Sequence, residues 1–170
     1  MELLVVRHAV AKDAEAFARK GKPDGERPLT KEGRREFRRG ARGIARLAGE
    51  VDVLATSPLV RARETAALLA PALGCGRPLR RPELAAGAPA RKLVAWLARQ
   101  RRGATVAVVG HEPDLSRLVA LLATGRAQDA IVIEKGGACL LAFDGAVRAG
   151  AGTLRWLLTA RQLRRLGRGR

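Results

Sequence analysis

The sequence predicts an α/β fold: a three-layer αβα sandwich whose mostly parallel central sheet carries antiparallel edge strands. Three short apolar runs rich in β-forming residues, near residues 3–6, 51–55 and 105–109, alternate with amphipathic helical segments. Such alternation is typical of strand–helix–strand units, whose parallel strands are buried on both faces. A chain of 170 residues has the size of one ordinary domain. We therefore expect a single domain over residues 1–160, followed by a basic tail over residues 161–170.

The first part of the chain contains one predicted strand and one long predicted helix. Leu3–Val6 is a continuous apolar run that ends at the polar pair Arg7-His8, as in a strand in the middle of a sheet. The charged segment 11–28, which contains glycine and proline, predicts a long loop with a short helix around residues 14–20. Thr30 can cap a helix of about 18 residues. The apolar face of that helix comprises Phe37, Ala41, Ile44, Ala45 and Ala48, opposite a face rich in arginine.

The middle part repeats the pattern of a strand followed by a helix. Residues 51–55 predict a second strand. Ser57 and Pro58 then predict a helix start, because serine caps a helix and proline fits its first position. We expect this helix to end near residue 73. Further along we expect, in order, a helix over residues 90–100, a strand over 105–109 and a helix over 113–123.

The last third is expected to be mainly strands joined by glycine-rich turns. Apolar runs near residues 131–134, 138–143 and 154–158 predict three strands. The segment around Gly145–Gly152 predicts a hairpin connection at the edge of the sheet. The arginine-rich residues 161–170 form the predicted basic tail.

The charge balance is strongly basic, with 33 Lys or Arg against 16 Asp or Glu, giving a net charge of +17. Because 47% of the residues are hydrophobic, the chain is not a disordered polycation. Arginine supplies 27 of the 33 basic residues, which fits either bidentate recognition of phosphate or carboxylate or a general bias toward arginine. Aromatic residues make up only 3%, which weakens a role in binding single-stranded nucleic acid.

The sequence gives no sign of a metal site, a cofactor or a membrane segment. Cys75 and Cys139 lie far apart without a CxxC motif, so we expect two reduced thiols rather than a zinc site or a disulfide framework. The brief apolar run before Arg7 does not fit a signal peptide, and no stretch approaches the roughly 20 apolar residues that span a bilayer. We expect a cytoplasmic protein.

Polar residues that could carry chemistry gather where the predicted parallel strands end. His8 and His111, which are the chain's two histidines, each follow a strand directly, and Arg7 accompanies the first of them. Arg61 lies on the first turn of the helix after the second strand. Ligands of open α/β sheets bind at the carboxyl ends of the strands. The guanidinium groups and two nearby helix N-termini predict an anion site at this edge.

The chemistry expected of this cluster is phosphoryl transfer. The sequence contains no glycine-rich Walker motif and no paired carboxylates for a divalent metal, so the protein's own cations would hold the phosphate. In that field a histidine is driven toward its neutral form, which leaves a ring nitrogen free as a nucleophile. The second histidine, when protonated, can stabilise the charge of the phosphoryl oxygens.

Four motifs in this order resemble the histidine phosphatase superfamily, whose wider members include the phosphoglycerate mutases. The compact length, Pro82-Glu83-Leu84 and the closing Trp156-Leu157-Leu158 look most like its SixA-type branch, the protein-histidine phosphatases. The resemblance spans nearly the whole chain. The motifs are Leu4–Ala9, Arg27–Thr30 with Gly33, Ser57–Ala66 and Gly110–Pro113.

The resemblance implies a role for each residue of the cluster. His8 becomes the nucleophile that is phosphorylated, and Arg7, Arg61 and His111 form the rest of the phosphate pocket. The superfamily often has glycine after the nucleophilic histidine, whereas this chain has the equally small Ala9. The compact branch keeps the superfamily's proton donor less clearly. Glu83 is the candidate donor by position, and a partly exposed loop carboxylate is the alternative interpretation.

Several functions are compatible with these features. The leading hypothesis is a phosphatase for protein phosphohistidine, on a carrier of a histidine phosphorelay or of a phosphotransferase system. Protonation of a phosphoramidate nitrogen demands less of an enzyme acid than expulsion of an alkoxide, which favours this substrate. The runner-up is a small-molecule phosphomonoesterase that acts on a sugar phosphate or a nucleotide. A mutase needs a more closed site, and a basic module that binds nucleic acid or an acidic protein is the alternative from another class.

Overall fold

In the computed structural model, which describes residues 1–168, six strands form one sheet in the order β3-β2-β4-β1-β5-β6. Strands β1 to β4 run parallel to one another, whereas β5 is antiparallel to β1, and β6 is antiparallel to β5. The predicted parallel sheet with an antiparallel edge is therefore confirmed. The strands are β1 (Glu2–Arg7), β2 (Val53–Thr56), β3 (Leu79–Arg80), β4 (Thr105–Gly110), β5 (Ala138–Ala142) and β6 (Thr153–Leu158).

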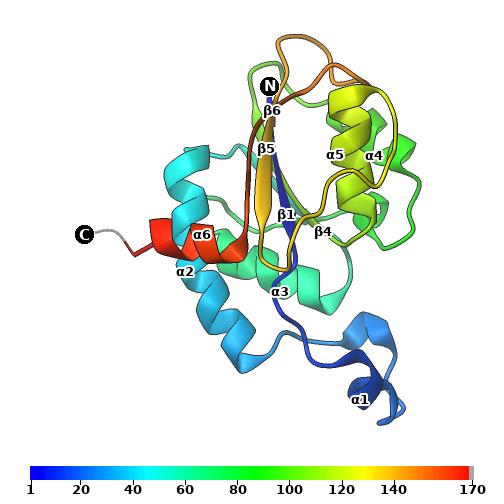
Figure 1. Ribbon diagram of the computed structural model, residues 1–170, viewed down its shortest axis with the longest axis vertical. Helices are drawn as coiled ribbons and strands as arrows, with labels where there is room; N and C mark the ends of the chain where they lie inside the picture. Colours follow the sequence, from blue (N-terminus) through cyan, green and yellow to red (C-terminus); the bar gives the residue numbers. More distant parts are fainter. Residues whose placement is uncertain (169–170) are drawn as a thin grey trace.

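Helices cover both faces of this sheet, as Figure 1 shows. One layer contains α2 (Lys31–Ala48), α3 (Val60–Leu69) and α6 (Ala160–Leu166), and the other contains α4 (Ala90–Leu97) and α5 (Asp114–Thr124). Within β1, Leu4 and Val6 pack toward the first layer, and Leu3 and Val5 pack toward the second. This alternation explains why the strand is apolar throughout, because both of its faces are buried. The predicted three-layer sandwich is confirmed.

Beyond the carboxyl end of β1 lies the segment that the sequence predicted as a long loop (Figure 1). It contains the predicted short helix, α1 (Ala14–Ala18), and a 3-10 turn, η1 (Asp24–Glu26). A second 3-10 turn, η2 (Pro82–Leu84), follows β3. These short elements lie at the end of the sheet where we expected the site. The sequence does not predict the two-residue strand β3, because it is very short and lies in a connection that contains proline.

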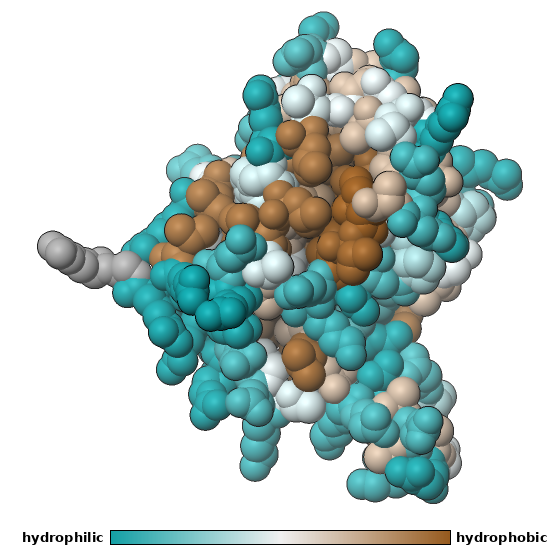
Figure 2. Space-filling view, viewed as in Figure 1, coloured by the Kyte–Doolittle hydropathy of each residue, from teal (hydrophilic) through white to brown (hydrophobic). Residues whose placement is uncertain are grey.

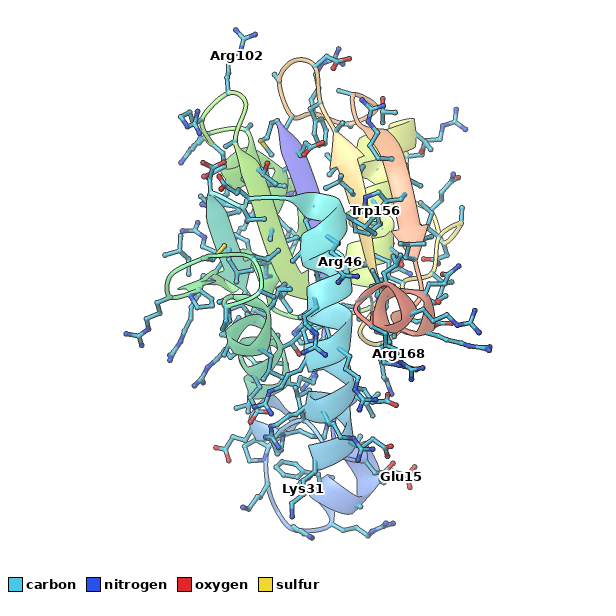
Figure 3. All side chains as sticks on the ribbon, turned by 90° about the vertical axis from the view of Figure 1, so that its left-hand side faces the viewer. Glu15, Lys31, Arg46, Arg102, Trp156 and Arg168 are labelled. Carbon is cyan, nitrogen blue, oxygen red and sulfur yellow. The ribbon has the colours of Figure 1, made fainter. Side chains whose placement is uncertain are left out.

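The first part of the predicted basic tail is instead a helix, α6, which lies against α2 (Figure 3). Thr159 and Gln162 form a capping box, and Leu163 is fully buried against the α2 layer. The backbones approach so closely that a Cβ atom at Gly43 would lie 2.0 Å from the carbonyl oxygen of Leu163. The sequence did not predict this helix, because its many arginines make the segment look like an exposed tail. The last two residues of the tail, 169–170, lie outside the described residues.

Two further expectations about secondary structure were wrong. Residues 131–134 are not a strand, because they cross the end of the sheet and the Ile133 carbonyl accepts a hydrogen bond from Arg7 instead of from a neighbouring strand. Helix α3 begins at Val60 rather than at Pro58 and ends at Leu69. Its expected cap, Ser57, is turned toward His111.

The antiparallel hairpin β5–β6 forms an edge of the sheet, as predicted. Apolar atoms gather on the face of the molecule near this edge in Figure 2, where Leu154 and Leu157 of β6 are both 38% exposed. Of the two cysteines, Cys139 is buried and Cys75 is half-buried, and both are free thiols. Within residues 1–168, none of the helices combines the length and the apolar character needed to cross a bilayer.

Candidate active site

Strand register brings the two histidines to the same height at the carboxyl edge of the sheet. Arg7 at the end of β1 is paired with Gly110 at the end of β4, so His8 and His111 are the next residues on neighbouring strands. Their ring centroids are 5.1 Å apart. The side chains are largely shielded, with 6% of His8 and 4% of His111 exposed.

The hydrogen bond of His8 determines which ring nitrogen is free. Its Nδ1 lies 2.7 Å from the carbonyl oxygen of Ala9. Because a carbonyl can only accept, Nδ1 carries the proton, and Nε2 of the neutral ring keeps its lone pair. The backbone is itself fixed, since the amide of Ala9 donates to Thr65 Oγ1 over 3.0 Å. His8 therefore presents the lone pair of Nε2, the atom a nucleophilic histidine would use, from a rigid position.

His111 is oriented by a serine that we had predicted to cap a helix. Nε2 of His111 lies 2.7 Å from Ser57 Oγ, and the amide of Leu59 donates to the same Oγ over 3.3 Å. Ser57 Oγ accepts that bond and can donate its own hydroxyl proton to His111 Nε2, which corresponds to the tautomer with the ring proton on Nδ1. Nδ1 of the neutral His111 ring is then an N–H donor. This nitrogen is buried and has no hydrogen-bond partner in the described part of the chain.

Both arginines of the cluster are held at one end and free at the other. Nη1 of Arg7 donates to the carbonyl of Ile133 over 2.8 Å, and Nη1 of Arg61 donates to the carbonyl of Asp24 over 3.0 Å. The Nε atom of each is buried and unpaired within residues 1–168. Fixing Nη1 orients the planar fork, so that the remaining N–H groups form a pre-organised site for an anion.

A carboxylate from the η1 turn lies against the outer side of Arg61. Asp24 Oδ2 lies 3.0 Å from Arg61 Nη1, and Asp24 Oδ1 lies 2.7 Å from Arg27 Nε. Burial alone would raise the pKa of Asp24, but the guanidinium groups of Arg27 and Arg61 outweigh it and hold this pKa below its ordinary value. Asp24 thus remains charged and anchors the loop over the site. Nothing in the sequence pattern singled it out.

Burial and positive charge keep both histidines neutral. Burial, with Arg61 and Arg7 adding repulsion, lowers the pKa of His8 to about 4. Burial, the neighbouring His8 ring and Arg61 lower the pKa of His111 to about 3. The neutral nucleophile expected from the sequence fits this result. The protonated second histidine does not describe the anion-free site, where His111 acts through a neutral N–H.

Helix α3 ties the site to the rest of the fold through two residues that the sequence analysis quoted only as part of a motif. Thr65 Oγ1 accepts from Ala9 and donates to the carbonyl of Arg61 over 2.7 Å, which links the loop after β1 to the helix that carries Arg61. Glu64 accepts from the amide of Leu29 and from Arg34. Both follow Arg61 by one helical turn, at three and four residues, and this spacing is the signal that could have identified them.

Glu83, the predicted proton donor, lies on the η2 turn in a cleft that His111 also lines. Its Oε1 is 2.7 Å from Nη2 of Arg81. Burial would raise the pKa of Glu83, but its own backbone amide and Arg81 outweigh this and hold the pKa below its ordinary value. The structure thus brings Glu83 to the neighbourhood of His111, but as a carboxylate rather than as a carboxylic acid.

Within residues 1–168, no group of three or more His, Cys, Asp or Glu side chains is placed so that it could hold a metal ion. The cations of the site are those of Arg7 and Arg61, supported by the N–H of His111. This arrangement of one nucleophilic nitrogen and three oriented donors suits the binding and transfer of a tetrahedral oxyanion.

A family model and a related protein sequence both match this chain. The model of the histidine phosphatase superfamily (branch 1) matches residues 3–86. An uncharacterized protein of Picosynechococcus sp. is 34% identical over 139 residues, which are 81% of this chain and 82% of the relative.

Solved structures show the same similarity. The protein histidine phosphatase SixA complexed with tungstate is 26% identical, with a TM-score of 0.80 over 96% of this chain and 99% of its own. A protein proposed to be the phosphohistidine phosphatase SixA of Nakamurella multipartitia is 26% identical, with a TM-score of 0.71 over 92% and 94%. A phosphoserine phosphatase mutant of Entamoeba histolytica, at 17% identity and a TM-score of 0.68 over 95% and 98%, shares the fold alone.

Proposed function

The chain belongs to the histidine phosphatase superfamily, in its compact SixA-type branch, and is a phosphatase; from this premise we propose that it dephosphorylates phosphohistidine carried by a protein. The observation that carries the proposal is the set of buried donors around His8. Arg7 Nε, Arg61 Nε and His111 Nδ1 have no hydrogen-bond partner within the described residues. Buried polar groups are normally paired, so three such donors beside one nucleophile mark a phosphoryl site.

In the first step, the lone pair of His8 Nε2 attacks phosphorus, and the bond between phosphorus and the leaving group breaks. Arg7 and Arg61 neutralise the phosphoryl oxygens, and His111 donates its Nδ1–H to one of them. The proton stays on His8 Nδ1, and its hydrogen bond to the carbonyl of Ala9 stabilises the cationic ring of the phosphoenzyme. In each of Arg7, Arg61 and His111, one nitrogen is held by a hydrogen bond to the protein, which aims another nitrogen at the phosphoryl group.

In the second step, water attacks the phosphorus of phospho-His8, and the bond to Nε2 breaks with return of the electron pair to the ring. Inorganic phosphate and neutral His8 result, so the enzyme is regenerated without any cofactor. Binding of the phosphate dianion opposes the repulsion from Arg7 and Arg61, which raises the pKa of both histidines above their values in the free site.

A protein substrate is favoured by the compact chain, which has little inserted structure to enclose a small molecule. Carriers of a histidine phosphorelay or of a phosphotransferase system present their phosphohistidine on a protein surface and are the partners we propose. A cytoplasmic location, where such carriers act, is part of the same proposal. The likeness of fold to a phosphoserine phosphatase makes small phosphomonoesters the competing substrates to test.

The test is to trap the phosphoenzyme and to map the label. Labelled phosphohistidine protein, mixed with enzyme and quenched rapidly in alkali, should give acid-labile phosphate on His8. A label on any other residue would overturn the mechanism. Turnover of phosphohistidine protein, a sugar phosphate and an aryl phosphate should then rank in that order in kcat/KM, and a sugar phosphate in first place would overturn the substrate assignment.

A further inference from the structure

A cleft beside the phosphate pocket has features that suit a particular leaving group. Its volume is about 170 Å³, and His111 and Glu83 both line it. His111 is shared with the phosphate pocket, so a group attached to the bound phosphorus can extend into the cleft. Most of its floor is apolar and comes from side chains that are at most 4% exposed, namely Leu84, Leu93, Leu115 and Leu118.

The charged side chains that line the cleft have partners, but one carboxylate oxygen of Glu83 is unpaired within residues 1–168, as is Nε of the neighbouring Arg81. Arg117 pairs with Asp129, and Asp114 accepts a hydrogen bond from the amide of Gly87. Glu83 Oε1 pairs with Arg81, but Glu83 Oε2 is buried and has no hydrogen-bond partner within residues 1–168. An apolar ring that brings one N–H donor would satisfy this oxygen, whereas a second phosphate or carboxylate would face a negative charge.

Glu83 is held firmly in this orientation. The guanidinium of Arg81, which binds Oε1, also lies over the ring of Trp96, with 5.0 Å from Cζ to the ring centroid. Arg81 is thereby fixed from two sides, by a carboxylate and by an aromatic face. The remaining oxygen of Glu83 is consequently a pre-organised acceptor rather than a freely rotating surface group.

We propose that this cleft receives the imidazole ring of the substrate phosphohistidine, with Glu83 Oε2 accepting a hydrogen bond from the ring nitrogen that does not carry phosphorus. This inference rests on the proposed function and deepens it, because it assigns the part of the site that recognises the leaving group. Glu83 then acts as an acceptor for a proton that the substrate brings, and not as the proton donor expected from the sequence.

The chemistry of the P–N bond explains the value of such an acceptor. When the second ring nitrogen is protonated, attack by His8 Nε2 breaks the P–N bond and returns its electron pair to the ring nitrogen. The ring leaves as neutral imidazole, and its proton stays on the nitrogen bound to Glu83. No proton has to reach the leaving atom. An alkoxide, by contrast, needs a proton from an acid, which an ionised Glu83 does not supply.

The surroundings of Glu83 support this role. Arg81 and, from α4, Lys92 favour its charged form. The other titratable groups that line the cleft are His111, Asp114 and Arg117. A carboxylate beside the bound ring favours the protonated ring, and therefore extends phosphohistidine turnover to higher pH.

The experiment compares Glu83→Gln with wild type on three substrates: phosphohistidine protein, phosphoimidazole and an aryl phosphate with a good leaving group. A hydrogen bond to a charged group predicts a loss of about ten- to a hundredfold in kcat/KM for the first two substrates. The aryl phosphate, whose leaving group has no N–H, should change by about twofold or less. Glu32→Gln, which removes an exposed charge on α2, is the matched control and should leave all three rates unchanged.

The pH profile separates this role from a structural one. In Glu83→Gln, the fall of phosphohistidine turnover on the alkaline side should begin about one pH unit lower, because the bound ring loses its proton more easily. Equal losses on all three substrates with an unchanged profile would show a structural role and overturn the inference. Absence of phosphohistidine turnover in the wild type would instead overturn the proposed function itself.

Discussion

The arginines of the phosphate pocket and those on the outer face of α2 carry the same charge in opposite settings. Arg61 is 6% exposed, its Nη1 is fixed by Asp24, and its Nε faces the pocket. The side chain of Arg35 is 67% exposed, and its partner in the described part of the chain is Glu32, three residues earlier on the same helix. An exposed pair of this kind contributes little. Orientation and burial, rather than the number of arginines, therefore give this strongly basic chain its function.

The largest expected effect comes from replacing His8, the proposed nucleophile beside the pocket arginines. His8→Ala eliminates the nucleophile, so turnover of phosphohistidine protein should fall at least about a thousandfold. The small replacement leaves the sheet intact, which circular dichroism and the thermal midpoint should confirm. A variant that keeps substantial activity in a phosphate-release assay would contradict the mechanism.

Replacement of arginine by lysine tests the comparison directly. Arg61→Lys keeps the charge but loses the fork that binds Asp24 on one side and phosphate on the other, so kcat/KM should fall about a hundredfold and vanadate or tungstate should inhibit more weakly. Arg35→Lys is the matched control, and its kinetics should stay within about twofold of wild type. Kinetics of Arg61→Lys as close to wild type as those of Arg35→Lys would show that charge alone is sufficient.

Burial of the pocket should also appear in the dependence of stability on pH. His8 and His111 have folded pKa values of about 4 and about 3, below the ordinary value of 6.5, so the unfolded chain binds more protons in this range. Their stabilising contribution is complete above about pH 6.5 and is lost as the pH falls toward 3. For each histidine the loss is on the order of 3 kcal/mol.

Chemical denaturation at several pH values measures this loss. His111→Asn should make the decrease in unfolding free energy between pH 6.5 and 4 clearly shallower than in wild type. An equally steep decrease in that variant would mean that His111 does not titrate as a buried neutral group.

The smallest expected effect is on the free energy of unfolding and comes from substitutions on the buried side of α2, where packing against α6 matters rather than charge. Gly43→Ala places a Cβ against the Leu163 carbonyl at 2.0 Å and should destabilise the fold by about 1–3 kcal/mol. Gly40→Ala meets Leu163 Cβ at an ordinary 3.9 Å and should stabilise by about 0.5–1 kcal/mol through its helix propensity. Denaturant melts of both variants should therefore shift in opposite directions. A stabilised Gly43→Ala would contradict the close contact between α2 and α6.

The sequence sufficed for the long strands of the sheet and for the placement of the candidate site residues at one edge. His8 and His111 could be placed side by side because each directly follows a buried apolar run, and parallel strands end at one edge. Arg7 followed from the same position, and Arg61 from the helix after β2. These inferences depended on apolar strand segments and a helix start, and the structure retains these local elements.

The supporting residues could not be predicted, because their roles arise from contacts between distant segments. Ser57 looked like a helix cap, and only the fold shows it beside His111, 54 residues away. Asp24 lay in a charged loop among other polar residues. The apolar residues 131–134 resembled a strand, yet the Ile133 carbonyl serves Arg7. For α6, the arginines concealed the single buried side chain, that of Leu163, which docks the helix.

The position of β1 between β4 and β5 determines when this enzyme can form during its synthesis. Within residues 1–168, the strand partners of β1 are residues 105–110 and 138–142, which are made much later than β1 itself. A nascent chain that lacks β4 cannot bring His111 beside His8, so the proposed site is not yet assembled. During this interval the apolar segment Leu3–Val6 has no sheet to join. The growing chain is therefore most in need of protection from aggregation before its last third has been made.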